Sequence, residues 1–236
     1  MALLSLHGIG KRYRQGEVEV SALQGIDLEI EEGEFVALVG PSGSGKTTLL
    51  NIVGGLDAPS EGRTELNGTD ITTLKEARLS DFRLFQLGFI FQAYNLVPVL
   101  SALENVELVM VMQGRPAEDR RRRAQHYLDL VGLDKVMHRR PSALSGGQQQ
   151  RVAVARALAA GPRLVLADEP TANLDSENAT ALLDIMHRLA RKQKTTFIFS
   201  THDQRVMERA ERIVTLRDGK IVDDRRVEAR HHEHAD

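Results

Sequence analysis

The fold of this chain is decided by one octapeptide, Gly40-Pro41-Ser42-Gly43-Ser44-Gly45-Lys46-Thr47. It follows the apolar run 35–39 and leads into the apolar-rich run 48–53, an order that predicts a strand, a glycine-rich turn and a helix. The octapeptide matches the phosphate-binding pattern G-x-x-x-x-G-K-[ST] at every fixed position. The alternative is a flexible turn that contains a lysine by chance. This interpretation is weaker than a phosphate-binding loop, because it does not explain why a strand precedes the octapeptide and a helix follows it.

The residue types of this loop suggest its chemistry. Gly40, Gly43 and Gly45 permit backbone conformations that direct successive N–H groups at one anion. The helix that begins near Lys46 adds unpaired N–H groups and the positive end of its dipole. Lys46 would contact the β- and γ-phosphates of a nucleotide, and the Thr47 hydroxyl would bind Mg²⁺. The expected nucleotide contacts here are Gly40, Pro41, Ser42, Gly43, Ser44, Gly45, Lys46, Thr47 and Thr48.

The composition is that of an ordinary globular protein. Its 236 residues suit one domain, or one domain with an inserted subdomain. The formal net charge of −2 gives no general attraction to nucleic acid or anionic lipid, and the lack of cysteine excludes disulfides and thiolate metal sites. We expect no signal peptide in the first eight residues, and the apolar run 106–112 is too short to cross a bilayer. Any membrane role is expected to act through a partner.

The segments around the octapeptide differ in character. Residues 3–39 predict a β region, because apolar and polar residues alternate there. Residues 87–91 predict a buried strand, and Gln92 follows at the strand end, where ligand-facing residues collect in open α/β sheets. From about 93 to 158 the pattern becomes helical. The arginine run 120–123 is expected to be the solvated face of a helix rather than a nucleic-acid patch.

Two later strands also end in polar residues. The buried run 164–167 leads into Asp168 and Glu169, adjacent carboxylates that are costly at a strand end unless they are used. Asp168 is placed to hold Mg²⁺, directly or through water, and Glu169 lies near where a water would attack. The strand 196–200 is followed by His202, in a third ligand-facing position.

The segment 144–148 predicts the start of a long, alanine-rich helix. Ser145 can cap it, while Gly146 and Gly147 leave its N-terminus open to an anion. An ordinary capped helix would explain the serine. It would not explain paired glycines where alanine is more stable.

The two ends of the chain carry less information. Tyr13, between two arginines, is either an aromatic that stacks on a nucleotide base or a surface tyrosine on an edge strand. Residues 213–222 predict a hairpin with an Asp-Gly turn. Residues 225–236 are expected to form a charged, disordered tail, in which the histidines at 231, 232 and 234 are expected to be solvated rather than a metal site.

Taken in order, these motifs closely resemble the ATP-binding-cassette (ABC) ATPases, over nearly the whole chain to about residue 224. The octapeptide looks like Walker A, 164–168 like Walker B, and 144–148 is identical to the family signature. Gln92 matches the Q-loop glutamine, 172–175 the D-loop with Asp175, and His202 the switch histidine. The resemblance implies that Tyr13 stacks on adenine and that Gln92 helps to hold Mg²⁺. Other P-loop classes fit worse, because no guanine-reading N-K-x-D element is present.

The fold class implied is α/β. It is a P-loop NTPase core of the RecA type with an N-terminal antiparallel β region and an inserted α-helical signature subdomain at about 93–158. The ABC domain is expected to span 1–224 and the tail 225–236.

The resemblance also implies a head-to-tail dimer of two copies, with each ATP between Walker A of one and the signature of the other. Ser145, Gly146, Gly147 and Gln148 would then contact a nucleotide in trans, which agrees with an open helix end that has no phosphate of its own. Glu169 would act as the general base, with His202 and Gln92 assisting it.

Within the family, residues 92–106 look most like the branch of lipoprotein-releasing, macrolide-exporting and cell-division ATPases. The expected partner is an integral membrane permease that docks near 92–103, where Leu96, Val97, Val99 and Leu100 would form an apolar socket or instead pack onto the core. The expected location is the cytoplasmic face of the inner membrane, with no nucleic-acid partner.

The alternatives to a transporter ATPase of this branch are a regulator that transports nothing, an amino-acid-type importer, and a soluble ATPase acting on DNA or ribosomes. The last fits poorly, because the chain has neither a second cassette nor a coiled-coil insertion.

Overall fold

The computed structural model describes residues 2–16, 18–203 and 207–227. The α-helices are α1 (Lys46–Val53), α2 (Glu76–Gln86), α3 (Ala102–Met112), α4 (Ala117–Leu130), α5 (Gly146–Ala159) and α6 (Ser176–Gln193). The strands are β1 (Ala2–Gln15), β2 (Val18–Glu31), β3 (Phe35–Val39), β4 (Glu61–Leu66), β5 (Thr69–Asp70), β6 (Leu87–Ile90), β7 (Leu164–Asp168), β8 (Thr196–Thr201), β9 (Arg212–Arg217) and β10 (Lys220–Arg226). Short 3₁₀ turns lie at Ile71–Thr73, Asp134–Val136 and Pro141–Ala143.

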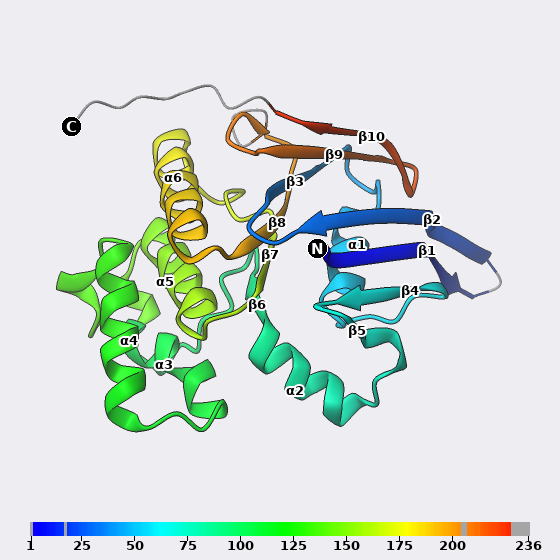
Figure 1. The fold of residues 1–236 in the computed structure, drawn as a ribbon. Coiled ribbons are helices and arrows are strands. Elements are labelled where there is room, and N and C mark those ends of the chain that lie inside the picture. The colour runs from blue at the N-terminus through cyan, green and yellow to red at the C-terminus, as the bar shows by residue number, and fades with distance from the viewer. Residues whose placement is uncertain (1, 17, 204–206, 228–236) are drawn as a thin grey trace.

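A six-stranded sheet forms the centre of the molecule, in the order β10-β9-β3-β8-β7-β6 (Figure 1). The strands from β9 to β6 are parallel, and only β10 pairs antiparallel, with β9. β3, β7 and β8 are almost wholly buried, which explains why their sequences are continuous apolar runs instead of alternating ones. This is the α/β arrangement that the sequence predicts.

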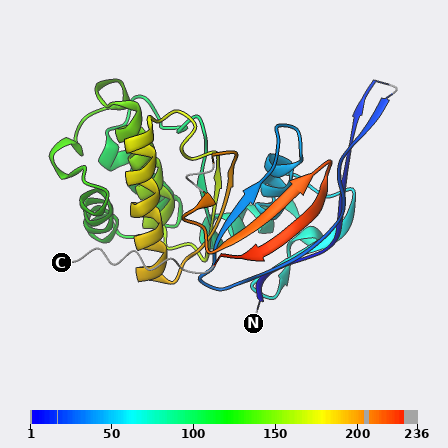
Figure 2. The ribbon, with the colours of Figure 1, turned by 90° about the horizontal axis from the view of Figure 1, so that it is seen from above.

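The two faces of this sheet are covered differently. Phe35, Ala37 and Val39 of β3 point into a core shared with helices α3, α4, α5 and α6, which we call the helical-side core. Val36 and Leu38 point into a core shared with α1 and the second sheet, the β-side core. The phosphate-loop helix α1 and the signature helix α5 therefore lie on opposite faces of the sheet (Figures 1 and 2).

The second sheet is antiparallel, in the order β2-β1-β4-β5. The far end of the β1–β2 pair reaches beyond the rest of the molecule in Figure 2. This sheet is the β region that the sequence predicts for residues 3–39, joined by the later strands β4 and β5.

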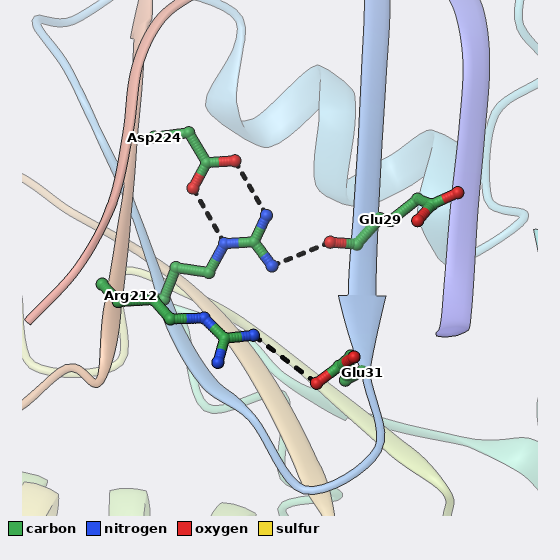
Figure 3. A pocket seen from close by; sticks show the side chains of 5 residues that line it. Glu29, Glu31, Arg212 and Asp224 are labelled. Carbon is green, nitrogen blue, oxygen red and sulfur yellow. Dashed lines mark hydrogen bonds and ion pairs between the residues drawn. The ribbon is translucent and has the colours of Figure 1, made fainter. Parts of the chain in front are cut away.

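A cluster of charges ties the two sheets together. Arg212 of β9 donates to both Asp224 oxygens at 2.8 Å and to the backbone oxygen of Glu29 on β2 at 2.8 Å (Figure 3). Arg212 also reaches Glu34 at 2.9 Å, and its side chain is only 13% exposed. Arg226 of β10 adds ion pairs to Glu31 and Glu34. Bidentate and largely desolvated arginine pairs hold geometry better than single surface pairs.

One helix has no counterpart among the sequence predictions, and two predictions need correction. No prediction covers residues 69–86, where α2 lies; none of its residues is fully buried, and only Leu79 and Phe82 pack, partly buried, against the β-side core. The expected tail begins too early, because Arg225 and Arg226 continue β10. The arginine run on α4 is only partly a solvated face, because Arg123 donates to the Ala159 carbonyl at 3.1 Å and is half-buried. The histidines at 231, 232 and 234 lie outside the described residues.

Candidate nucleotide site

The register of the sheet brings the predicted site residues to one edge. Val39 pairs with Thr201, Asp168 with Ser200, and Ile90 with Ala167. The residues that follow these strands are the phosphate loop, Glu169, His202 and, one residue after Phe91, the exposed Gln92. Four segments distant in sequence thus meet where the parallel strands end.

The phosphate loop needs glycine at two positions for steric reasons. Gly45 has a φ of +103°, and a Cβ there would lie 2.7 Å from the Ala22 carbonyl oxygen. Gly40 has a φ of +150°, and a Cβ there would collide with the Leu216 carbonyl oxygen. Side chains at these positions would displace the strand and hairpin that support the loop.

The loop also holds polar groups that suit an anion. Lys46 is 7% exposed, and its Nζ donates to the carbonyls of Gly40 at 2.8 Å and Pro41 at 3.0 Å, so the cation folds over the loop. The Ser44 hydroxyl is buried without a hydrogen-bond partner. α1 begins at Lys46 with no side-chain cap, which leaves its first N–H groups for a ligand.

Oxygen donors for a divalent cation lie beside the loop. The Thr47 hydroxyl donates to the Asp168 carboxylate at 3.1–3.2 Å, and the buried Ser200 hydroxyl donates to Asp168 Oδ1 at 2.6 Å. Hydroxyl and carboxylate oxygens are the ligands that Mg²⁺ prefers, usually together with water and phosphate oxygens. The donor set therefore fits Mg²⁺, although the described residues contain no group of three or more acidic, histidine or cysteine side chains.

Glu169 and His202 form a close pair. Glu169 Oε1 lies 3.2 Å from His202 Nδ1, and the Glu169 N–H donates to Ser200 Oγ at 2.9 Å. Glu169 has a φ of +45°, an uncommon conformation for a residue other than glycine. Both side chains line a cavity of about 200 Å³ with Thr171, Ala172, Leu174, Thr201 and Asp203. This pair has the geometry of a carboxylate base oriented by an imidazole.

Tyr13 is held by neighbours on either side of its ring. Its hydroxyl donates to Asp57 Oδ2 at 2.8 Å, and Lys11 Nζ lies 4.9 Å from the ring centroid while pairing with Asp57 at 2.6 Å. Burial raises the pKa of the Tyr13 hydroxyl, and the bond to Asp57 raises it further. The Thr48 side chain is another hydrogen-bonding neighbour, which places Tyr13 beside α1. Tyr13 is 38% exposed as a whole residue, so it is accessible from solvent for contact with a base.

The signature helix α5 is capped by Ser145, as the sequence predicts, and Gln148 also takes part in the cap. Ser145 accepts from the Gln148 N–H, and the Gln148 side chain accepts in turn from the Ser145 N–H at 2.9 Å, a complete capping box. Gln148 therefore has a structural role besides any contact with a nucleotide. A Cβ at Gly146 would lie 2.9 Å from the Tyr94 hydroxyl, and one at Gly147 would lie 3.6 Å from Asn178.

Asp175 and Gln92 also have structural partners. Asp175 caps α6 by accepting from the Asn178 N–H at 2.9 Å, and this hydrogen bond lowers the pKa of the carboxyl. The backbone oxygen of Gln92 accepts from Asn173 at 2.9 Å, which joins the segment after β6 to the segment after β7.

Several supporting residues are not found by the sequence analysis. Arg156 of α5 is 9% exposed and donates to the backbone oxygens of Tyr94, at 2.8 Å, and Asn95, without an acidic partner among the described ion pairs. Burial lowers the pKa of this guanidinium. Gln150, 1% exposed, donates to the Pro170 oxygen at 2.7 Å. No local pattern marks these residues, because their partners are backbone atoms far along the chain.

Comparison with known proteins agrees with this geometry. The family model described as "ABC transporter" matches residues 23–172. An uncharacterized ABC transporter ATP-binding protein of Thermotoga maritima is 48% identical over 93% of both chains. The lipoprotein-releasing system ATP-binding protein LolD of Anaeromyxobacter dehalogenans is 48% identical over 94% of this chain and 93% of its own. The macrolide export ATP-binding/permease protein MacB of Brucella melitensis is 47% identical, and this chain covers 34% of it.

A solved structure is similar throughout. The dimeric post-hydrolysis structure of the ATP-binding cassette MJ0796 bound to ADP and Pi matches with a TM-score of 0.89 at 40% identity, over 96% of this chain and 99% of that one. No helix among the described residues has both the length and the apolar character to span a bilayer.

Proposed function

The chain belongs to the ABC transporter family as an ATP-hydrolysing subunit that works as a dimer, and we propose that it drives a membrane permease with the site residues described above. One observation carries the hydrolytic part of the proposal: Glu169 lies 3.2 Å from His202, at the same sheet edge as the phosphate loop. Similarity to LolD and to MacB, an ATP-binding/permease protein, supports a membrane partner. A position on the cytoplasmic face of the inner membrane is part of the proposal.

In this proposal, the phosphate loop and Lys46 bind the phosphates of ATP, and Tyr13 stacks on the adenine. Thr47, Asp168 and Gln92 would hold Mg²⁺, which neutralises charge on the transferred phosphoryl group. Glu169 accepts a proton from the attacking water while His202 orients its carboxylate. Ser145, Gly146 and Gly147 of the second copy complete the site, and their N–H groups and helix dipole stabilise negative charge on the γ-phosphate.

The experiment is copurification followed by reconstitution. The full chain, isolated under mild conditions from its own cells, should carry an integral membrane protein that raises its ATPase rate in vesicles. Uptake or release of labelled candidate substrates then separates a transporter from a regulator that transports nothing. An ATPase that hydrolyses ATP but retains no membrane protein would contradict the proposed coupling.

A further inference from the structure

A large cavity lies at the sheet edge opposite to the nucleotide site. It has a volume of about 860 Å³, and its lining includes Glu32, Arg163 and Thr195, which precede β3, β7 and β8. Gly40, Glu169 and His202 follow these same parallel strands. Since each strand rises about 3.3 Å per residue over its five or six residues, the two edges are roughly 17–20 Å apart. The cavity is therefore separate from the nucleotide site.

The lining of this cavity is strongly basic. Its cations come from three segments: Arg122 and Arg123 on α4, Arg163 before β7, and Lys192 and Lys194 at the end of α6. Two acidic side chains oppose them. Glu32 pairs with Arg163 at 2.7 Å, and Asp119 pairs with Arg122 at 2.6 Å. Among the described residues, neither Lys192 nor Lys194 has an ion pair.

The C-terminal ends of two helices offset part of this positive charge. Arg123 donates to the Ala159 carbonyl at the end of α5, and the two lysines lie at the end of α6. Each helix C-terminus carries about half a negative charge. After these ends and the two carboxylates are counted, an excess of about two positive charges remains, in a chain whose formal net charge is −2.

One wall of the cavity is apolar. Tyr127, Leu130 and Pro162 line it, and the Tyr127 hydroxyl is fixed by a 2.9 Å hydrogen bond to Gln193. The volume lies within the range of about 300–1,000 Å³ that small-molecule sites occupy. Guanidinium groups suit phosphate geometry, and lysines supply point charges for it.

We propose that this cavity binds a phosphate-bearing anion, with the phosphate among the arginines and lysines and the ligand's apolar body against the Tyr127 wall. The phosphate could belong to a soluble phosphomonoester or to a lipid headgroup, since both present the same charge. No residue of its lining belongs to the nucleotide site, so removing a cation from it should leave the basal ATPase rate unchanged.

The test uses the full chain with its nucleotide site filled by ADP and Mg²⁺. Glycerol 3-phosphate binding is measured by calorimetry, and binding to phosphatidylglycerol vesicles by sedimentation, with phosphatidylcholine vesicles as the neutral control. The variant Lys192→Gln/Lys194→Gln removes two cavity cations. The variant Lys75→Gln/Lys135→Gln removes two exposed lysines elsewhere and serves as the matched control.

We expect the cavity variant to bind at least about tenfold more weakly than wild type, because each lysine supplies a charge-assisted contact. The control variant should bind as wild type does, and both should keep the wild-type melting temperature and ATPase rate. Binding of glycerol 3-phosphate assigns a soluble ligand, and binding of phosphatidylglycerol vesicles alone assigns a lipid headgroup. The proposal is overturned if neither probe binds, or if the cavity and control variants bind equally well.

Discussion

At the residue scale, the two carboxylates proposed for the site, Asp168 and Glu169, are positioned by a serine that no sequence motif marks. Ser200 lies inside β8 and is fully buried, yet it donates to Asp168 and accepts from the Glu169 N–H. The positive φ of Glu169 then turns its side chain toward His202. The sequence predicts the carboxylates because they end an apolar strand, but a serine in the next strand looks like any other polar residue.

Glu169→Gln tests the general base directly. The amide keeps the size of the side chain but cannot accept the proton from water, so hydrolysis should fall by about two to four orders of magnitude. ATP binding should persist, because Glu169 contacts the water rather than the phosphate loop, and the dimer should accumulate with ATP bound. The measurements are steady-state phosphate release, nucleotide affinity and gel filtration. Near-wild-type hydrolysis would remove Glu169 from this role.

At the element scale, α5 joins the two segments that follow β6 and β7. Gln150 donates to the Pro170 oxygen, next to Glu169, and Arg156 donates to the loop that follows Gln92. That loop holds two consecutive residues, Tyr94 and Asn95, at φ values of +45° and +51°. Such conformations each cost roughly 1–2 kcal/mol, so the contacts from α5 offset a real strain.

Arg156→Met should show whether Arg156 positions the loop at Tyr94 and Asn95 or mainly stabilises the fold. Methionine fills a similar volume and removes the cost of burying a charge, but the Tyr94 and Asn95 oxygens lose their donor, so the melting temperature should fall by only a few degrees. The loop at Tyr94 and Asn95 loses two donors, however, and Gln92 should become less well positioned. We expect hydrolysis and stimulation by the membrane partner to fall several-fold with unchanged ATP affinity. Arg151→Met, on the same helix, is the matched control. A collapse of the melting temperature would assign Arg156 a merely structural role.

The loop at 96–100 is not a uniformly exposed apolar socket, because some of its apolar side chains pack inward. Leu96 is partly buried and packs against the helical-side core, whereas Val99 is 68% exposed. Asn105, fully buried, accepts from the Val97 N–H and donates to three carbonyls, those of Val97, Leu100 and Ser101, which fixes the loop's shape. For Leu96 itself, packing rather than docking is the role that the structure favours.

Val99 is accordingly the residue for a docking test. Val99→Asp should leave folding and basal hydrolysis unchanged but abolish partner binding, because it puts a charge at the exposed apolar tip. Leu96→Asp should instead lower the melting temperature, since it brings a charge toward the core. Val222→Asp, 54% exposed on β10, is the matched control. Retention of the partner by the Val99 variant would place docking elsewhere.

The elements that the sequence predicts best are those with local signals. The boundaries of β3 and β7 follow from apolar runs, and the start of α5 follows from its cap. α2 has only a weak signal, because its inward face is narrow: Leu79 and Phe82 pack partly buried against the β-side core, and no residue of the helix is fully buried. Arg123 and Arg156 look like ordinary helix cations in sequence, and only the folded chain shows that they contact distant carbonyls.

At the scale of the whole molecule, the two helices whose N-termini are proposed to bind phosphate lie on opposite faces of the sheet. α1 packs in the β-side core and α5 in the helical-side core. Under the proposed function, the N-terminus of α5 would contact the nucleotide of a second chain and not the nucleotide bound by α1 of its own chain. The dimeric ADP- and Pi-bound structure of MJ0796, similar throughout, supports the self-association that such an arrangement needs.

A mixing experiment tests the shared site. Lys46→Ala should abolish hydrolysis by removing a phosphate contact, and Ser145→Arg should abolish it by filling the partner's anion site while each monomer still binds ATP. In a mixed dimer, the wild-type Lys46 of one chain meets the wild-type Ser145 of the other, so one of the two sites is intact. With independent sites, about a quarter of wild-type activity should return if the chains pair at random, and up to about half if the two variants pair only with each other. Lys46→Ala mixed with the double variant has no intact site and is the control. If the first mixture is as inactive as the second, either each site lies within one chain or both sites must be intact for turnover. ATP-dependent dimerisation of Ser145→Arg alone then distinguishes these two cases. A shared site forbids this dimerisation, so a Ser145→Arg dimer would show that each site lies within one chain.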